Sequence, residues 1–276
     1  MSRLPIVDVI KKALCHRACV PVDAKGYVAT PQDNLVPGVR LDQFDSDLQQ
    51  GGGHELAGKF RALHSSSVLA VNTFAPFKNQ PHDLILLGQR GFGPPTFEHQ
   101  LPTGLKGTPP TLDVFFRCGD EVVAIESKFF EYFSRKNAKF SPSYSKANLP
   151  FAEDSWWKVM EDAKKAGRQY LDVAQLVKHY FGLIHLLEHG DPTGWKPEKA
   201  TLLYLFWEPD NWQEVEICQT HRGEITDFQS GVSQSKIHFR SISYPELWRT
   251  WASEPSLETH IRHLRKKYVI HVSLEE

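Results

Sequence analysis

The sequence predicts an α/β protein in which helices cover a mixed central sheet, and three observations lead to this prediction. Short apolar runs bounded by glycine and proline occupy residues 84–130, as is typical of strands. Apolar residues at helical spacing then extend over 154–189. A further apolar and aromatic run at 202–207 has the length of one buried strand. This order of strands, helices and another strand indicates a layered α/β or α+β domain.

The length and composition exclude several classes of protein. A chain of 276 residues fits one large domain or two small ones, and it can bury a core unaided. With 41% hydrophobic and 24% charged residues, the chain is neither disordered nor of low complexity. The formal net charge of −1 excludes a global basic field, so any contact with a polyanion must come from a local patch.

The number of cysteines and the hydropathy of the sequence indicate the cellular compartment. The four cysteines are too few and too scattered for a disulfide framework, which favours a reduced, intracellular setting. The first residues include no apolar stretch of signal-peptide length, and the sequence nowhere has the roughly 18 consecutive apolar residues of a membrane span. We therefore expect a soluble, cytoplasmic protein that makes no membrane contact.

The first part of the chain predicts an N-terminal extension over residues 1–50 and a domain over 51–276. The extension contains a short amphipathic helix at 6–18 and then a Pro/Gly/Asp-rich stretch without a sustained period. After three glycines, helical spacing of apolar residues predicts a helix over 55–63.

The middle of the chain is predicted to form several strands. Strands are predicted at 84–87, 96–98, 112–118 and 121–130. The last two are joined at Gly119-Asp120, a strong two-residue turn signal, and so form a hairpin.

The segments after the hairpin complete the predicted core. The polar and basic segment 134–148 is expected to be a mobile loop. Two helices are predicted within 154–189, where the sequence Gly-Asp-Pro ends them, and a strand follows at 202–207. The predicted core therefore covers 51–207, and residues 208–276 form a C-terminal elaboration.

Two carboxylates and a lysine are predicted to converge on the hairpin. Side chains alternate along a strand, so Glu126 and Lys128 leave one face while Val123, Ile125 and Ser127 leave the other. Asp113 and Glu126 each lie six residues from the turn pair, so they fall level with each other on the two antiparallel strands.

Such a constellation favours a metal site. Convergent carboxylates repel each other, and burying them together costs several kcal/mol unless a cation neutralises them. Mg²⁺ prefers oxygen ligands and usually keeps waters beside one or two carboxylates and a substrate phosphate, and Mn²⁺ is an alternative. Lys128 can orient a water or stabilise charge at the attacked phosphate.

The segment Pro110-Thr111-Leu112-Asp113, followed by Glu126-Ser127-Lys128, resembles the pattern of the PD-(D/E)xK nuclease superfamily, which has the restriction-endonuclease-like fold. The resemblance covers residues 51–207. It departs from the pattern in one respect, because the proline does not directly precede Asp113. Glu55 matches a glutamate on the helix that precedes the sheet in this family, and Gln169, followed by Tyr170, matches a glutamine that some members use after the motif.

The resemblance implies a restriction-endonuclease-like mixed sheet flanked by helices and the Mg²⁺-dependent hydrolysis of DNA. Asp113, Glu126 and the main-chain carbonyl of Ser127 would hold the metal. Glu55 would touch a metal or its water, and Lys128 would position the attacking water. Gln169 is the remaining catalytic candidate.

A local basic segment is the predicted contact for DNA. Residues 134–168 contain eight Lys and Arg against four Asp and Glu, with Phe140 and Tyr144 between them. A solvated polar loop beside an amphipathic helix explains the same composition. The predicted nucleic-acid-binding residues are Arg135, Lys136, Lys139, Lys146, Lys164, Lys165 and Arg168.

Two other functions are also compatible with the sequence. The same fold could serve as a DNA-binding module that has lost turnover. Residues 185–189 also fit the pattern H-x-x-E-H of a zinc protease, for which Glu258 is the most plausible third ligand. For a nuclease with one active site, cutting both strands requires a homodimer or successive nicks.

Overall fold

A five-stranded mixed sheet forms the centre of the protein. The computed structural model describes residues 5–51, 56 and 58–273. In the sheet the strands follow the order β1-β2-β3-β6-β7; β1, β2 and β3 are antiparallel neighbours, and β3, β6 and β7 are parallel neighbours. The strands are β1 (Thr96–Gln100), β2 (Thr111–Cys118), β3 (Glu121–Lys128), β6 (Lys199–Phe206) and β7 (Ile237–Ser243).

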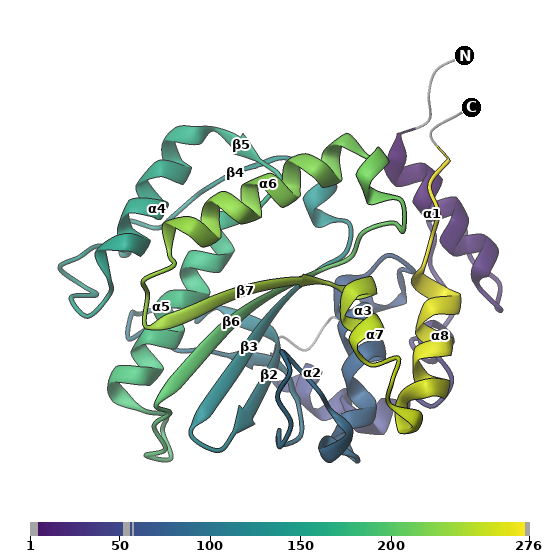
Figure 1. The fold of residues 1–276 in the computed structure, drawn as a ribbon, viewed down its shortest axis with the longest axis horizontal. Coiled ribbons are helices and arrows are strands. Elements are labelled where there is room, and N and C mark those ends of the chain that lie inside the picture. The colour runs from purple at the N-terminus through teal and green to yellow at the C-terminus, as the bar shows by residue number, and fades with distance from the viewer. Residues whose placement is uncertain (1–4, 52–55, 57, 274–276) are drawn as a thin grey trace.

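Helices cover both faces of this sheet (Figure 1). One layer consists of α4 (Asp154–Ala166), α5 (Val173–His189) and α6 (Glu216–Gly231). The other contains α1 (Ile6–Arg17), α2 (Asp45–Gly51), α3 (Ser66–Phe74), α7 (Tyr244–Thr250) and α8 (Glu258–Tyr268). Short 3₁₀ turns lie at Gln32–Asn34, Leu41–Gln43, Lys59–Arg61, Ala75–Lys78, Pro81–Asp83, Glu131–Phe133, Trp212–Glu214 and Pro255–Leu257. The predicted fold class, a mixed sheet flanked by helices, is confirmed.

The two faces of β3 divide the core. Val123 and Ile125 belong to the hydrophobic cluster shared with α1, α3, α7 and α8. Val122 and Ala124 belong to a second cluster shared with α4, α5 and α6. The even-numbered residues of β3 therefore face α5, as the strand period predicts.

The predicted hairpin is also confirmed. Strand β2 pairs with β3 from Cys118↔Glu121 to Val114↔Ile125, and Gly119 adopts the left-handed φ of +57° that a tight turn requires. The next step of this register brings Asp113 level with Glu126.

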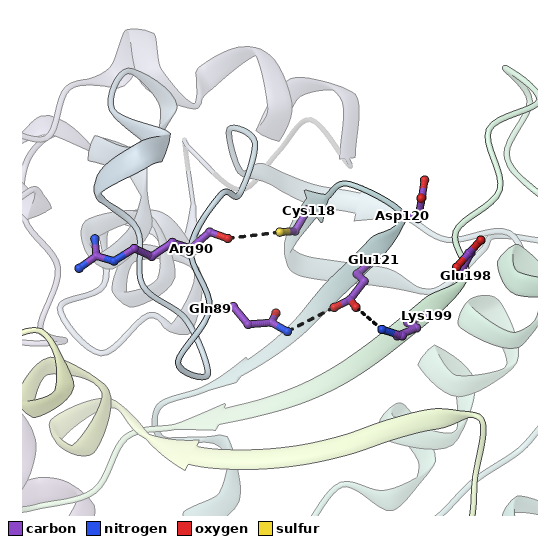
Figure 2. Close-up of a pocket in the computed structure, with 7 residues that line it drawn as sticks. All are labelled: Gln89, Arg90, Cys118, Asp120, Glu121, Glu198 and Lys199. Atoms are coloured by element: carbon purple, nitrogen blue, oxygen red, sulfur yellow. Dashed lines mark hydrogen bonds and ion pairs between the residues drawn. The ribbon is translucent and has the colours of Figure 1, made fainter.

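A shallow hollow of about 440 Å³ lies beside this turn (Figure 2). Glu121 lies between Gln89 and Lys199 there and accepts a hydrogen bond from each. The hollow is at the start of β3, roughly 20 Å along the strand from Lys128 at its end. It is therefore separate from the predicted catalytic residues.

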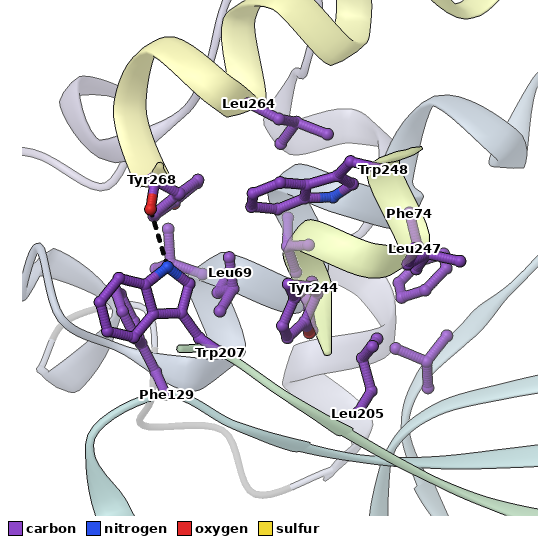
Figure 3. Close-up of a cluster of buried hydrophobic side chains, with 14 of the residues drawn as sticks. Leu69, Phe74, Phe129, Leu205, Trp207, Tyr244, Leu247, Trp248, Leu264 and Tyr268 are labelled. Atoms are coloured by element: carbon purple, nitrogen blue, oxygen red, sulfur yellow. Dashed lines mark hydrogen bonds between the residues drawn. The ribbon is translucent and has the colours of Figure 1, made fainter. Parts of the chain in front are cut away.

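The terminal segments pack into the same core as the sheet. Ile10 and Leu14 of α1 are buried in the cluster that contains α8. Trp207, just after β6, donates from Nε1 to the main-chain oxygen of Tyr268 at 2.7 Å (Figure 3). Strand β7 lies beyond residue 207, so the sheet extends past the predicted core. The predicted boundaries at 50 and 207 stay predictions.

Two elements expected between residues 55 and 87 were wrong. Residues 84–87 form no strand, because Leu86 and Gln89 close a turn in which Leu87 has a φ of +54°. The helix expected over 55–63 is a 3₁₀ turn at Lys59–Arg61 in its described part, and the α-helix follows later, at α3.

The helix α3 was missed because it has no polar face. Every residue from Val68 to Phe74 is buried, so the alternation of apolar and polar residues that reveals a surface helix is absent. The side chain of Ser65 caps its start by accepting from the main-chain N–H of Val68.

The segment 134–148 is mostly irregular, with a two-residue strand. Strand β4 (Lys136–Asn137) pairs with β5 (Arg168–Gln169), and the ring of Tyr144 stacks on Phe181 of α5. The segment therefore contacts both α5 and the short strand that precedes it. Among the described helices, none has the length and apolar character needed to cross a bilayer.

Candidate active site

The last residues of β3 place a carboxylate and an ammonium in the interior. Glu126 is 0% exposed and Lys128 is 7% exposed. Lys128 Nζ donates to Glu126 Oε1. The main-chain N–H of Ser127, between them, donates to Oδ2 of Asp113 at 2.6 Å. The three residues predicted from the hairpin thus lie together.

Helix α5 completes this cluster with two residues that the sequence did not suggest. Lys128 Nζ donates to Oε1 of Gln175 at 2.8 Å, and Nε2 of His179 lies 2.6 Å from Oε2 of Glu126. Gln175 and His179 are four residues apart, so they share one face of the helix. Asp172 caps α5 by accepting from the main-chain N–H of Gln175, which holds the first turn over the end of β3.

Gln169 lies elsewhere. It is on β5, before α5 begins, and pairs with Lys136 of β4. The glutamine that contacts Lys128 is Gln175, six residues later. Among the described contacts, none joins Gln169 to Lys128 or Glu126. The catalytic role predicted for Gln169 therefore has no support from its position.

Opposing effects set the protonation of this cluster. Burial, together with the nearby charge of Glu126, raises the pKa of Asp113 well above its usual value. Burial alone would also raise the pKa of Glu126, but Lys128 and His179 lower it below the usual value. Burial would lower the pKa of Lys128, but Glu126 and Asp113 raise it. Glu126 and Lys128 are therefore a charged pair, and burial together with the charge of Glu126 makes Asp113 the carboxyl of the two that binds a proton more readily.

A third carboxylate lies beside Asp113. Phe97↔Val114 and His99↔Leu112 pair β1 with β2, so Glu98 is level with Asp113. Glu98 has a φ of +49°, an unusual conformation for a residue with a side chain, and it interrupts the regular pairing at this point. Its charge contributes to the raised pKa of Asp113. The alternating pattern of strand β1 gave no sign of this unusual conformation.

The donor chemistry of the cluster fits a hard divalent cation. Asp113, Glu126 and the carbonyl of Ser127 supply oxygen ligands, and Mg²⁺ commonly uses one or two protein carboxylates together with waters and phosphate. In the part of the chain that the structure describes, no group of three or more His, Cys, Asp or Glu side chains could hold a metal ion. Glu55, the further ligand suggested by sequence, lies outside the described residues.

The predicted basic residues are all exposed. Lys136 pairs with Asp172 at 3.4 Å, which connects β4 to the cap of α5 and so to Gln175. Arg135 stacks on the ring of Tyr170, with its guanidinium carbon 4.6 Å from the ring centre. Other pairs join Lys146 to Asp154 and Lys164 to Glu161.

The competing zinc site does not assemble. His185 and His189 do lie on one turn of α5, with ring centres 4.7 Å apart. Glu188, between them, pairs with Lys236. The expected third ligand, Glu258, begins α8, which packs with the cluster on the other face of the sheet. Glu258 therefore cannot join His185 and His189 as a third ligand, and the hypothesis of an H-x-x-E-H zinc protease is wrong.

Comparison with known proteins identifies a family for the chain. Searches of curated proteins and of solved structures returned no significant match. A family model described as "Restriction Endonuclease associating with ARP" matches residues 13–269. The matched region runs from within α1 to just beyond α8, so it contains the whole sheet, the buried cluster and both layers of helices. The chain therefore belongs to this family of restriction endonucleases associating with ARP.

Proposed function

We propose that the protein is a Mg²⁺-dependent deoxyribonuclease with a PD-(D/E)xK-type active site formed by Asp113, Glu126 and Lys128. Membership of a restriction-endonuclease family indicates a nuclease-like function with DNA as substrate. The single observation that carries the finer proposal is the buried Glu126–Lys128 pair beside Asp113.

Each residue has a role that follows from its environment. Asp113, Glu126 and the carbonyl of Ser127 would hold Mg²⁺, which when bound supplies positive charge against the scissile phosphate. Lys128 keeps its proton, because its carboxylate neighbours raise its pKa. It would therefore act as a hydrogen-bond donor that orients the attacking water and stabilises charge on the phosphate. Gln175 fixes the direction of its ammonium group.

In the reaction, the oxygen of water forms a bond to phosphorus while one ester P–O bond breaks. The water loses a proton to solvent, and the departing alkoxide gains one. Lys128 takes part without a net change of protonation. The rate therefore depends on alignment and charge, as is general for phosphoryl transfer.

The cluster also argues against a binding module that has lost turnover. Burying carboxylates that repel each other opposes folding, and a module that only binds DNA has no use for them. The exposed basic residues between β4 and the end of α4 would contact the phosphates, and a homodimer remains one of two routes to a double-strand break.

Metal removal tests the proposed function. Plasmid and linear DNA incubated with the purified chain should be cleaved with Mg²⁺ or Mn²⁺, and EDTA should stop cleavage. Ca²⁺, which binds oxygen ligands but tolerates looser geometry, should support DNA binding with little cleavage. Cleavage in EDTA at the same rate would contradict a metal-dependent mechanism. Binding without cleavage under every metal condition would favour the inactive module.

The basic surface can be tested separately with Lys139 and Lys165. Both are exposed, and neither forms an ion pair within the described residues. Replacing both with alanine should weaken binding to all DNA sequences alike and lower the salt dependence of binding by about two counterions. A variant with alanine at Lys12 and Lys25, exposed on the N-terminal segment, is the control with the same change of charge. Equal effects of the two variants in salt titrations would place the DNA elsewhere.

A further inference from the structure

We infer that His179 is a positioning residue for the metal site: its Nε2 holds the carboxylate of Glu126 so that Lys128 does not occupy both oxygens. This inference rests on the proposed function. It concerns the orientation of one ligand, and His179 itself touches neither the substrate nor the reacting atoms.

The contact is buried on both sides. His179 is 1% exposed and Glu126 is 0% exposed, and the atoms Nε2 and Oε2 are 2.6 Å apart. An ionised carboxylate can only accept, so Nε2 is the donor and carries the hydrogen. Oε1 meanwhile accepts from Lys128. The two donors approach different oxygens, and together they fix the plane of the carboxylate.

The other nitrogen of the ring shows that this histidine does not serve packing alone. Nδ1 of His179 is buried and has no hydrogen-bond partner among the described residues. An unsatisfied buried polar atom opposes folding, and an apolar side chain of similar size would avoid this cost. The contact with Glu126 is the gain that accounts for the histidine at this position.

The physical consequence concerns Mg²⁺. This ion demands near-octahedral geometry, so a ligand that is already oriented binds it better than a ligand that must rotate. If the donor at position 179 is removed, both oxygens of Glu126 are free to turn to the ammonium of Lys128. The cation would then compete with Lys128 for the carboxylate. Groups that hydrogen-bond to a metal ligand and orient it typically contribute 10–100-fold to metal affinity.

The test compares His179→Leu with His179→Gln. The amide of glutamine can place a donor near the position of Nε2, and leucine cannot. Calorimetric titration with Ca²⁺ should give a dissociation constant about 10–100 times higher for His179→Leu, and the Mg²⁺ concentration for half-maximal cleavage should rise by a similar factor. His179→Gln should recover most of both losses. DNA binding in EDTA should stay unchanged.

The matched control is His221→Leu. His221 is also fully buried, its Nδ1 also lacks a partner among the described residues, and its Nε2 meets the hydroxyl of Tyr204 at 2.9 Å. This variant should change thermal stability without changing Ca²⁺ affinity. Folded His179→Leu protein with wild-type Ca²⁺ affinity and wild-type Mg²⁺ dependence would overturn the inference alone. A wild-type chain that neither binds Ca²⁺ nor cleaves DNA would overturn the proposed function as well.

Discussion

Replacing Lys128 with alanine is expected to lower the rate of DNA cleavage about 100- to 1000-fold, the effect of removing one aligned charged donor from an active site. The ammonium of Lys128 is held by Glu126 and Gln175 at the end of β3, and among the described side chains no other Lys or Arg forms an ion pair with Glu126. The measurement is single-turnover cleavage at saturating Mg²⁺. DNA binding in Ca²⁺ should change little, because the basic surface is intact.

This substitution also leaves the charge of Glu126 without its main partner. Breaking a buried ion pair by removing one member costs about 3–5 kcal/mol. The double variant Glu126→Gln with Lys128→Ala removes both charges, and it should regain stability without regaining cleavage. This combination separates loss of the reaction from loss of the fold.

A lysine of the neighbouring strand is the matched control. Lys199 starts β6 and forms an exposed pair with Glu121 at 2.7 Å, at the end of the sheet away from the cluster. Lys199→Ala should change stability by less than about 1 kcal/mol and leave cleavage unaltered. If Lys128→Ala kept more than a tenth of the wild-type rate, the role given to this lysine would be wrong.

Local signals in the sequence were sufficient for the hairpin. The turn at Gly119-Asp120 and the alternation along β3 set the register, and the register determines that Asp113 comes level with Glu126. These relations need no knowledge of the rest of the chain. That is why the core of the candidate site could be predicted.

Contacts between residues far apart in the sequence could not be predicted from such local signals. Gln175 and His179 meet β3 from 47 and 53 residues further along the chain. Their spacing of four residues, which places both on one face of α5, is the local sign of a shared task. The sequence points to Gln169 instead, because it does not show that α5 begins only after Asp172.

Tertiary contacts also explain why residues 84–87, predicted to be a strand, form none. The main-chain oxygen of Ile85 accepts from Nε1 of Trp251 at 2.6 Å, and Leu84 and Leu86 are fully buried. The run is apolar because it packs against the C-terminal part of the chain. Apolarity of this kind resembles a strand in sequence, but no other strand of the described residues pairs with this run.

Replacing Asp113 with asparagine is expected to have two effects of opposite direction. Cleavage should fall about 100-fold or more, because an amide is a much weaker ligand for Mg²⁺ than a carboxylate. Thermal stability in EDTA should rise, because the neutral amide removes two costs that raise the pKa of Asp113, namely the burial of its charge and the repulsion from Glu126 and Glu98. For a domain of this size, each kcal/mol gained corresponds to about 2–4 °C in Tm.

The pH dependence of this stability difference has a definite sign. The folded-state pKa of Asp113 lies above the value of 3.8 for the unfolded chain, so the folded protein binds the proton more tightly. The contribution of Asp113 to stability is therefore complete below about pH 4 and is lost as the pH rises through the folded-state pKa. The difference between Asp113→Asn and wild type in EDTA should grow over that range and then level off, when Tm is compared at each pH.

Mg²⁺ should reverse the order of the two proteins. A ligand that binds only the folded state stabilises it in proportion to the logarithm of its concentration above the dissociation constant, so Mg²⁺ should raise the Tm of wild type and barely that of Asp113→Asn. The carboxylates oppose folding when the cation is absent and favour it when the cation is bound. Equal stabilisation of both proteins by Mg²⁺ would mean that Asp113 is not a ligand. A wild type more stable than Asp113→Asn in EDTA at pH 8 would show that burial and the repulsion from Glu126 and Glu98 do not make the charged form of Asp113 unfavourable.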